Sequence, residues 1–294
     1  MTRLDGLLIT GIGGFYYVEA DGELIECKAR GLHRHGGVTP LAGDKVSITV
    51  KRDGYASLDE IYPRKNRLAR PPVANLDKLF IVVSTCDPSP STIIIDKMTA
   101  IAADKDIDCT IVFTKTDLKS DDETASVYRR AGYRVITPSS ESSGLDEIRE
   151  EIRGRLCAFA GNSGVGKSTL LNRLLPELNL ETDSISKKLG RGRHTTRQVR
   201  LYACAGGYIA DTPGFAAIDV TGDELIPKEN LQFAFKEFEP FIGKCRFTGC
   251  AHIADSGCAV CSAVKEGIIP VSRHESYVSM YNAVKDLQAW QIKK

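Results

Sequence analysis

The sequence predicts a multi-domain α/β protein: an N-terminal OB-type β-barrel, a phosphate-binding α/β domain and a cysteine-rich C-terminal helical domain. Three observations predict this order. Short strand-like runs fill the first 66 residues, a glycine-rich loop occupies residues 161–168, and four cysteines crowd into residues 245–261. With 294 residues, 42% of them hydrophobic and 26% charged, the chain is long enough for two or three ordinary globular domains.

The N-terminal segment contains five short runs that read as strands, separated by Gly, Pro and Asp. The runs are Gly6–Thr10, Phe15–Glu19, Glu23–Arg30, Lys45–Val50 and Ala56–Ile61. Five strands of this length predict a small barrel of the OB type, which often binds nucleic acid on one face but also serves as a spacer or protein contact. Phe15, Tyr16 and Tyr17 could stack on bases or fill the barrel, and we expect whichever alternates inward to fill it. Residues 63–72 read as a linker.

Residues 161–168 read Gly-Asn-Ser-Gly-Val-Gly-Lys-Ser, a complete Walker A phosphate loop between a strand at 156–160 and a helix at 169–175. Its glycines allow a tight backbone cradle whose N–H groups point at phosphates, and the helix adds its positive N-terminal end. Lys167 is expected to reach the β- and γ-phosphates, and the Ser168 hydroxyl to ligate Mg²⁺. The predicted nucleotide contacts of this loop are Gly161, Asn162, Ser163, Gly164, Val165, Gly166, Lys167, Ser168 and Thr169.

A candidate base-binding motif, Thr114-Lys115-Thr116-Asp117, closes an apolar run at 109–113. It resembles the Asn-Lys-x-Asp motif of GTPases, in which a carboxylate accepts hydrogen bonds from the ring N–H and the exocyclic amine of guanine. Adenine offers no such pair, so Asp117 would select the base. Thr114 stands where Asn is usual, which leaves the loop-bracing hydrogen bonds of that Asn unaccounted for. Ser139 and Ser140 lie where a second base-contacting loop is expected.

Asp211-Thr-Pro-Gly214 follows the short apolar strand 208–210 and resembles the Asp-x-x-Gly motif that senses the γ-phosphate, although such residues also form ordinary turns. We expect Asp211 near Mg²⁺ and the Gly214 N–H near the phosphate. The base motif therefore precedes the phosphate loop, whereas most small GTPases have the reverse order. This order predicts a circularly permuted P-loop GTPase domain, which is tolerated where chain ends are exposed and close together.

The C-terminal region contains the spacing Cys245-x4-Cys250-x-His252-x5-Cys258. Three thiolates and one imidazole make a closed tetrahedral zinc site of the structural type. Spacing alone leaves Cys258 or Cys261 as the fourth ligand, and a disulfide or a cluster of buried small residues is the alternative. A helix over 273–292, whose aromatic residues are expected to pack in a core, follows the cluster. The remaining cysteines are expected to be reduced core residues: Cys27, Cys86, Cys109, Cys157 and Cys204.

The net charge of +1 does not indicate a polyanionic partner, so only local clusters of basic residues can do so. Two basic runs, at 28–34 and 187–200, are either solvated faces or contacts to RNA phosphates, and their place beside a nucleotide-dependent switch favours RNA. The second run contains Lys187, Lys188, Arg191, Arg193, Arg197 and Arg200. No stretch has the length of a membrane span and the first residues lack a signal-peptide core, so a cytoplasmic location is expected.

The barrel, the permuted motif order and the Cys-x4-Cys-x-His-x5-Cys pattern together resemble the ribosome small subunit-dependent GTPase A family over nearly the whole chain. The resemblance implies a GTPase that binds the 30S subunit and its 16S rRNA late in assembly, hydrolyses GTP when stimulated there, and departs. It also implies Cys258 as the fourth zinc ligand and residues 192–196 as switch I, with Thr195 or Thr196 as the switch threonine. We expect domains at 1–66, 73–222 and 223–294, and a monomer.

Phe215 follows the Asp-x-x-Gly motif where many small GTPases have a water-orienting Gln. Intrinsic hydrolysis is therefore expected to be slow, with the missing group supplied by His194 or by an RNA or protein group of the subunit. Because switch II leads directly into the zinc domain, hydrolysis is expected to shift that domain against the barrel. The rival interpretations are a P-loop kinase or ATPase, disfavoured by Asp117, and an RNA-binding clamp without multiple turnover.

Overall fold

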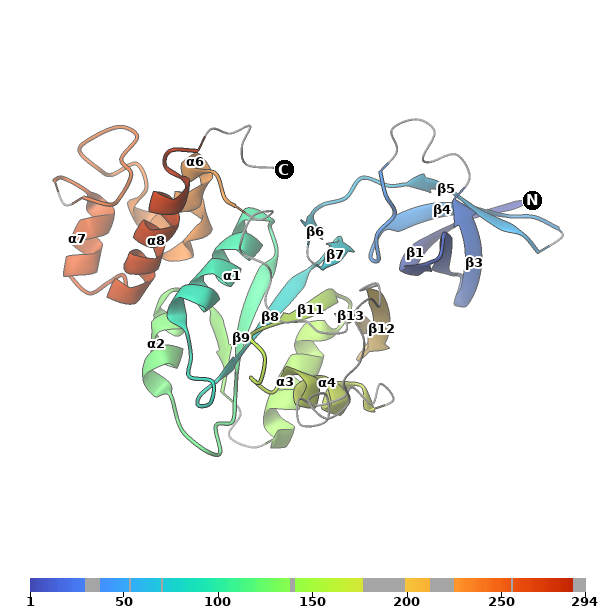
Figure 1. Cartoon of the computed structure of the whole chain (residues 1–294), viewed down its shortest axis with the longest axis horizontal. Coiled ribbons are helices and arrows are strands. Elements are labelled where there is room, and N and C mark those ends of the chain that lie inside the picture. Colours follow the sequence, from blue (N-terminus) through green and yellow to red (C-terminus); the bar gives the residue numbers. More distant parts are fainter. Residues whose placement is uncertain are drawn as a thin grey trace. The chain divides into compact units, whose positions relative to one another are not determined.

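A computed structural model describes residues 1–29, 38–52, 54–69, 71–137, 141–176, 199–211, 225–254 and 256–287 (Figure 1). Switch I as expected from the sequence, Gly214, Phe215, Ser139 and Ser140 all lie outside these residues. The chain divides into two compact units. One comprises Met1–Lys78, Ile148–Phe159 and Ser184–Phe215, and the other Leu79–Glu147, Ala160–Asp183 and Ala216–Lys294.

The N-terminal segment forms a closed five-stranded barrel in the order β1-β2-β3-β5-β4. The strands are β1 (Thr2–Ile12), β2 (Phe15–Ala20), β3 (Glu23–Ala29), β4 (Lys45–Val50) and β5 (Ala56–Ile61). Antiparallel pairs surround one parallel pair, β3 with β5, which closes the barrel. Inward-facing Leu8, Val18 and Ile48 are fully buried, and Tyr16 packs against this core, as alternation along β2 requires. The predicted OB-type barrel is confirmed.

A buried ion pair attaches the linker to the barrel. Asp44, which is fully buried, accepts hydrogen bonds from Arg64 Nε at 2.6 Å and Arg64 Nη2 at 2.7 Å, and from the Leu41 N–H at 2.7 Å. Gly43 has φ +91°, and a Cβ there would lie 2.1 Å from the Ala74 carbonyl oxygen. The turn before β4 therefore needs glycine and a carboxylate at adjacent positions. The linker also contains a short hairpin, β6 (Arg67–Ala69) with β7 (Pro72–Ala74).

A six-stranded sheet has the order β10-β9-β8-β11-β13-β12. Its strands are β8 (Lys78–Ser84), β9 (Asp108–Thr114), β10 (Arg134–Ile136), β11 (Leu156–Ala160), β12 (Arg200–Cys204) and β13 (Gly207–Asp211). β9 pairs with β10, and β11 with β13, in parallel, whereas β12 joins β13 as an antiparallel hairpin. Every residue of β8 and β11 is buried, as expected for strands covered on both faces. The strands predicted at 109–113, 156–160 and 208–210 are all present.

The helices of this α/β region follow the strands in the order that βαβ units require. They are α1 (Thr92–Asp104), α2 (Asp122–Arg130), α3 (Glu141–Ile152) and α4 (Lys167–Leu174). α2 begins at Asp121, whose carboxylate accepts from the Thr124 N–H, with Asp122 and Glu123 in its first turn. α4, the helix predicted after the phosphate loop, begins two residues earlier than expected.

The C-terminal region is built from short helices around an aromatic core. They are α6 (Lys228–Leu231), η2 (Gln232–Ala234), η3 (Lys236–Phe241), α7 (Ala259–Lys265) and α8 (Val271–Val284). Phe235, Phe238 and Tyr277 are buried, with ring centroids 4.8 to 5.3 Å apart. Tyr277 therefore has the core role expected of it. α8 ends at Val284, short of the predicted end at 292, and Trp290 lies outside the described residues.

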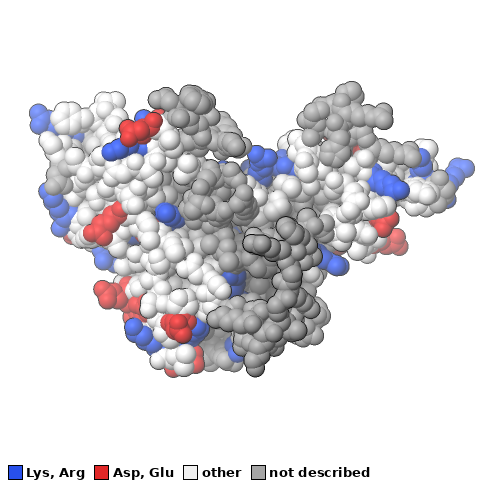
Figure 2. Space-filling model, in the orientation of Figure 1, with Lys and Arg blue, Asp and Glu red and all other residues white. Residues whose placement is uncertain are grey.

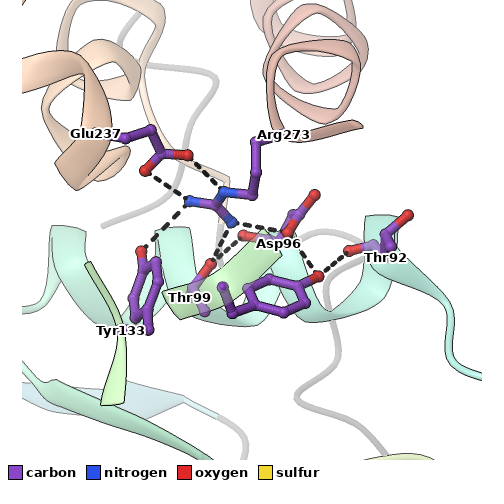
Figure 3. Close-up of polar contacts among 7 residues, drawn as sticks. Thr92, Asp96, Thr99, Tyr133, Glu237 and Arg273 are labelled. Atoms are coloured by element: carbon purple, nitrogen blue, oxygen red, sulfur yellow. Dashed lines mark hydrogen bonds and ion pairs between the residues drawn. The ribbon is translucent and has the colours of Figure 1, made fainter. Parts of the chain in front are cut away.

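A fully buried arginine joins this region to α1 (Figure 3). Arg273, in the first turn of α8, donates to both carboxylate oxygens of Glu237 at 2.5 and 3.2 Å and to Asp96 Oδ1 at 2.7 Å. It also donates to Thr99 Oγ1 at 3.0 Å. The side chains of Asp96 and Thr99 come from α1, and that of Glu237 from η3. We refer to Arg273, Asp96 and Glu237 as the buried ion cluster.

The cysteines are reduced as expected, but Cys86 does not lie in the core. All nine cysteines are free, and four of the five outside the C-terminal group are buried, with Cys86 half-buried. No described helix is long and apolar enough to span a membrane.

Candidate nucleotide site and metal centre

The phosphate loop runs from the buried strand β11 into the first turn of α4. A Cβ at Gly161 would lie 2.4 Å from the Val82 carbonyl oxygen, so the loop passes β8 at a distance that only glycine allows. Gly166 is the N-cap of α4 and has the left-handed conformation, φ +90°. Because glycine has no side chain, no capping side chain occupies the N–H groups of the first turn. The loop thus presents a helix N-terminus to an anion.

Lys167 folds back over this loop. Its Nζ donates to the Gly161 carbonyl at 2.9 Å and lies 3.5 Å from the Asn162 carbonyl. The ammonium group is therefore held at the concave side of the loop, where phosphate oxygens would compete for it as stronger acceptors.

Thr114 hydrogen-bonds the base motif to the phosphate loop. Its hydroxyl lies 2.5 Å from the Val165 carbonyl oxygen, to which it donates, and 3.2 Å from that of Val83. The Thr114 hydroxyl thus supplies the loop-bracing hydrogen bond that Asn makes in other GTPases. Thr85 adds a second brace, because its hydroxyl donates to the Lys115 carbonyl at 2.8 Å and its N–H to the Thr114 carbonyl at 3.1 Å.

Lys115 has the left-handed conformation, φ +58°, which is uncommon for a residue other than glycine. Its Nζ donates to the Asp87 carbonyl, and its own carbonyl accepts from Thr85 and from the Leu118 N–H at 3.0 Å. These contacts hold the turn in which Thr116 is half-buried and Asp117 is exposed. The structure therefore brings the base motif and the phosphate loop together. Thr85 and Asp87 had no sequence signal, because neither belongs to a motif.

Asp211 is the last residue of β13, as expected for the start of an Asp-x-x-Gly motif. The other predicted switch and base-loop residues lie outside the described part of the chain: Ser139, Ser140, His194, Thr195, Thr196 and Gly214. The basic run at 187–200 is described only at Arg200. On the face shown in Figure 2, the described Lys and Arg side chains are interspersed with Asp and Glu.

Cys245, Cys250, His252 and Cys258 form a cluster suited to a metal ion, referred to below as the metal centre, with all four candidate ligand atoms within 4.8 Å of one another. His252 Nδ1 lies 3.6 Å from Cys245 Sγ and 3.5 Å from Cys258 Sγ, and those two sulfurs are 3.9 Å apart. A tetrahedral ion with metal–sulfur bonds of about 2.3 Å and a metal–nitrogen bond of about 2.0 Å separates its ligands by roughly 3.5 to 3.8 Å. The separations among Cys245, His252 and Cys258 therefore fit a closed tetrahedral site, and Cys250 Sγ lies within 4.8 Å of each of them.

Cys261 is not part of this group. Its Sγ donates to the carbonyls of Ala254 at 3.3 Å and His252 at 3.6 Å, and its N–H donates to Cys258 Sγ at 3.4 Å. Cys261 thus supports the ligand loop, and the structure favours Cys258 of the two alternatives. The free thiols also exclude the disulfide interpretation for these residues.

Burial shifts the pKa values of three of the four groups in the metal centre, whereas at Cys245 hydrogen bonds outweigh burial and lower the pKa. Burial lowers the pKa of His252, which keeps its imidazole neutral, and raises the pKa of the Cys250 and Cys258 thiols to about 11. N–H groups of His252 and Ala259 donate to Cys250 Sγ and Cys245 Sγ at 3.4 and 3.3 Å. A bound cation would displace the thiol protons, and these N–H groups would then stabilise the thiolates.

A phosphate loop braced to a guanine-type base motif that precedes it in the chain defines a circularly permuted P-loop GTPase. Comparison with known proteins gives the particular family. The RsgA GTPase family model matches residues 61–221, and the RsgA N-terminal domain model matches residues 5–58. The chain belongs to the RsgA GTPase family and is a GTP hydrolase, which confirms the resemblance seen in the sequence.

Individual relatives match over almost their whole length. A protein of Alkaliphilus metalliredigens named "Small ribosomal subunit biogenesis GTPase RsgA" is 42% identical, covering 95% of this chain and 97% of its own. The protein of that name from Geobacillus kaustophilus is 43% identical, covering 96% and 98%. Two crystal structures are also similar. YloQ, "a circularly permuted GTPase", has a TM-score of 0.79 and 34% identity, with 98% of this chain and 96% of its own covered. YjeQ from Thermotoga maritima has a TM-score of 0.82 and 33% identity, with 98% of this chain and 100% of its own covered.

Proposed function

We propose that this GTPase acts in late maturation of the 30S ribosomal subunit. It binds the subunit in the GTP state, hydrolyses GTP to GDP and phosphate when stimulated by it, and dissociates. The observation that carries the proposal is the full-length similarity to relatives whose names state a role in biogenesis of the small ribosomal subunit. A barrel, a permuted GTPase region and a metal centre in one chain support the same assignment.

The nucleotide would lie along the phosphate loop with its base at the Thr114–Asp117 turn. Backbone N–H groups of the loop and Lys167 would hold the phosphates, Ser168 would hold Mg²⁺, and Asp117 would select guanine. Two contacts support this proposal: Thr114 bonds the base turn to the Val165 carbonyl of the phosphate loop, and Thr85 bonds the same turn to the end of β8. When bound, Mg²⁺ would neutralise charge developing on the phosphates.

The switch residues complete the proposed site. Asp211 would lie near Mg²⁺ and the Gly214 N–H near the γ-phosphate, with Thr195 or Thr196 closing switch I. Ser139 and Ser140 would contact the base. Hydrolysis would depend on the subunit, because Phe215 cannot orient water and His194 or a group of the subunit must do so.

Zinc is the metal proposed for the Cys245–Cys258 site. Three thiolates and one imidazole are a donor set typical of structural Zn²⁺, and the separations among Cys245, His252 and Cys258 fit its bond lengths. The ion, when bound, would cross-link a loop region that has few helical residues of its own.

The remaining assignments concern the partner and the organisation of the chain. The barrel and the two basic runs would contact 16S rRNA, the domains would span 1–66, 73–222 and 223–294, and the protein would act as a cytoplasmic monomer. Lys28, described at the edge of the first basic run, lies with its Nζ 4.9 Å from the centre of the Phe15 ring. This cation–aromatic pair on β2 and β3 resembles the surfaces on which nucleic acids bind.

The proposal is tested by GTP hydrolysis under multiple turnover, with and without purified 30S subunits and with ATP as the control substrate. Strong stimulation by 30S subunits with GTP alone supports it. Equal rates with and without subunits contradict the ribosomal role. Tight binding to subunits without multiple turnover would instead identify a nucleotide-dependent RNA clamp, and turnover of ATP would identify a P-loop ATPase.

A further inference from the structure

The imidazole of His252 is held from both sides. Its Nδ1 faces the sulfurs of Cys245 and Cys258 at 3.6 and 3.5 Å, and its Nε2 lies 3.0 Å from Gln232 Oε1. His252 is 2% exposed, so little water is available to replace the Gln232 contact. A buried imidazole that binds a metal through one nitrogen requires a partner for the other.

The orientation of the Gln232 amide follows from a second contact. Gln232 Nε2 lies 3.4 Å from the Glu229 carbonyl oxygen, to which it donates, so Oε1 is the atom turned toward His252. Because Oε1 only accepts, His252 must carry its proton on Nε2. The lone pair on Nδ1 then points at the thiols, as a metal ligand requires.

Two residues of α8 also reach this loop, but they hold its backbone. His274 Nε2 lies 2.7 Å from the His252 carbonyl oxygen, and the Tyr277 hydroxyl donates to the Ala251 carbonyl at 2.8 Å. Neither contact sets the rotation or the tautomer of the His252 ring. Among the described residues, the hydrogen bond that does so comes from Gln232.

Gln232 belongs to a segment with a second anchor. Residues 225–241 follow the region of the Asp-x-x-Gly motif in the chain and include η2 and η3, with Leu231 and Ala234 buried on either side of Gln232. Five residues after Gln232, Glu237 binds Arg273, which reaches Asp96 on α1 (Figure 3). The segment therefore contacts a metal ligand at one point and the ion cluster on α1 at another.

We propose that Gln232 is a positioning residue of the metal centre: it sets the tautomer and orientation of His252, and through it the metal ion holds the segment 225–241 in place. This inference rests on the proposed metal centre. It predicts that metal affinity depends on a hydrogen-bond acceptor at position 232. It also predicts that loss of the metal loosens the segment 225–241, which follows switch II in the chain and contacts α1 through Glu237 and Arg273.

The test measures metal affinity in the full-length protein, by chelator competition with Zn²⁺ and by the absorption spectrum of bound Co²⁺. Gln232→Ala is expected to weaken affinity by about 10- to 100-fold, as changes at such outer partners do. Gln232→Glu keeps an acceptor and is expected to bind at least as tightly as the unchanged protein. Asn230→Ala removes an exposed amide two residues earlier, in α6, and is the matched control, with no expected change.

A second readout reports the segment itself. Hydrogen exchange of backbone amides in 225–241 is expected to speed up in Gln232→Ala at sub-saturating metal and to return to the control rate in Gln232→Glu. Equal metal affinity for Gln232→Ala and the unchanged protein would overturn the inference while leaving the metal centre intact. So would a Gln232→Glu variant as weak as Gln232→Ala. If the unchanged protein bound no stoichiometric metal, the metal centre and the inference would both fail.

Discussion

Replacing Arg273 by Met should destabilise the C-terminal region far more than the usual loss of an arginine from the first turn of a helix. The guanidinium is completely buried and contacts two carboxylates and the Thr99 hydroxyl. Burial opposes its charge, but Tyr133, Glu237 and Asp96 outweigh burial and raise the pKa of Arg273 well above its ordinary value. The arginine is therefore charged at every accessible pH.

The expected magnitude follows from what the substitution leaves behind. Met fills much of the same volume, but Asp96 and Glu237 lose the cation that pairs with them in a site from which water is excluded, and Asp96 Oδ2 already has no hydrogen-bond partner among the described residues. Breaking a buried ion pair by removing one partner costs about 3–5 kcal/mol. Urea denaturation followed by circular dichroism should show this loss, and hydrogen exchange should place it in α1 and α8.

Two comparisons decide whether charge is the cause. Arg153→Met removes an arginine that is 67% exposed and pairs with Glu150 at 3.0 Å, and its cost should be at most about 1 kcal/mol. Adding Asp96→Asn and Glu237→Gln to Arg273→Met removes the buried charges and should recover part of the lost stability. If the triple variant is less stable than Arg273→Met, unpaired buried charge is not the origin of the effect and the reasoning is refuted.

Three further predictions concern the two sites. Asp117→Asn replaces a carboxylate that only accepts hydrogen bonds with an amide that can also donate. The protein should therefore lose at least about 100-fold in GTP affinity and gain affinity for XTP, measured by competition. An unchanged preference for GTP would show that another residue recognises the base. Thr114→Val removes the hydroxyl bound to the Val165 carbonyl and should weaken GDP binding by roughly 5- to 30-fold, with Thr114→Ser close to the unchanged protein, in a fluorescent-GDP titration; equal loss in both variants would point to packing instead. Burial lowers the pKa of His252, so its protonation favours the unfolded chain: its contribution to stability is complete above about pH 6.5 and falls as the pH drops below that value. Protons compete with the metal for the imidazole, so metal affinity measured by chelator competition should fall as the pH drops below that value, and an affinity independent of pH would contradict a ligand role for His252.

Local patterns in the sequence were sufficient for most of the fold. The five barrel strands, the strand before the phosphate loop and the helix after it were all predicted from periodicity and glycine spacing, and the structure contains them. The C-terminal helix was predicted too long, because α8 ends at Val284 although the residues after it would suit a helix. Its end is marked by Lys285 and Leu287 N–H groups that bond to Tyr281 and Val284, which composition alone does not reveal.

In the candidate sites, too, some features were predicted from the sequence and others needed the structure. The phosphate loop and the cysteine cluster were found because their chemistry needs particular residues at short, regular spacing. The hydrogen bond from Thr114 to Val165 joins residues 51 positions apart, and no sequence pattern near Thr114 predicts that partner. The choice of Cys258 over Cys261 also required coordinates, because both spacings are possible and only the direction of each sulfur separates them.

The sequence by itself determined the class of protein: three regions, a permuted motif order and a tetrahedral ligand set, all encoded in contiguous residues whose backbone and side-chain chemistry acts locally. Tertiary structure alone decided how these parts are held. Arg273 meets Asp96 across 177 positions and Gln232 meets His252 across 20. A single polar side chain has no periodicity, and arginine is usually exposed, so a sequence gives no reason to bury it. Such contacts exist because packing brings the groups together and excludes water, after which each buried polar atom must find a partner or cost stability.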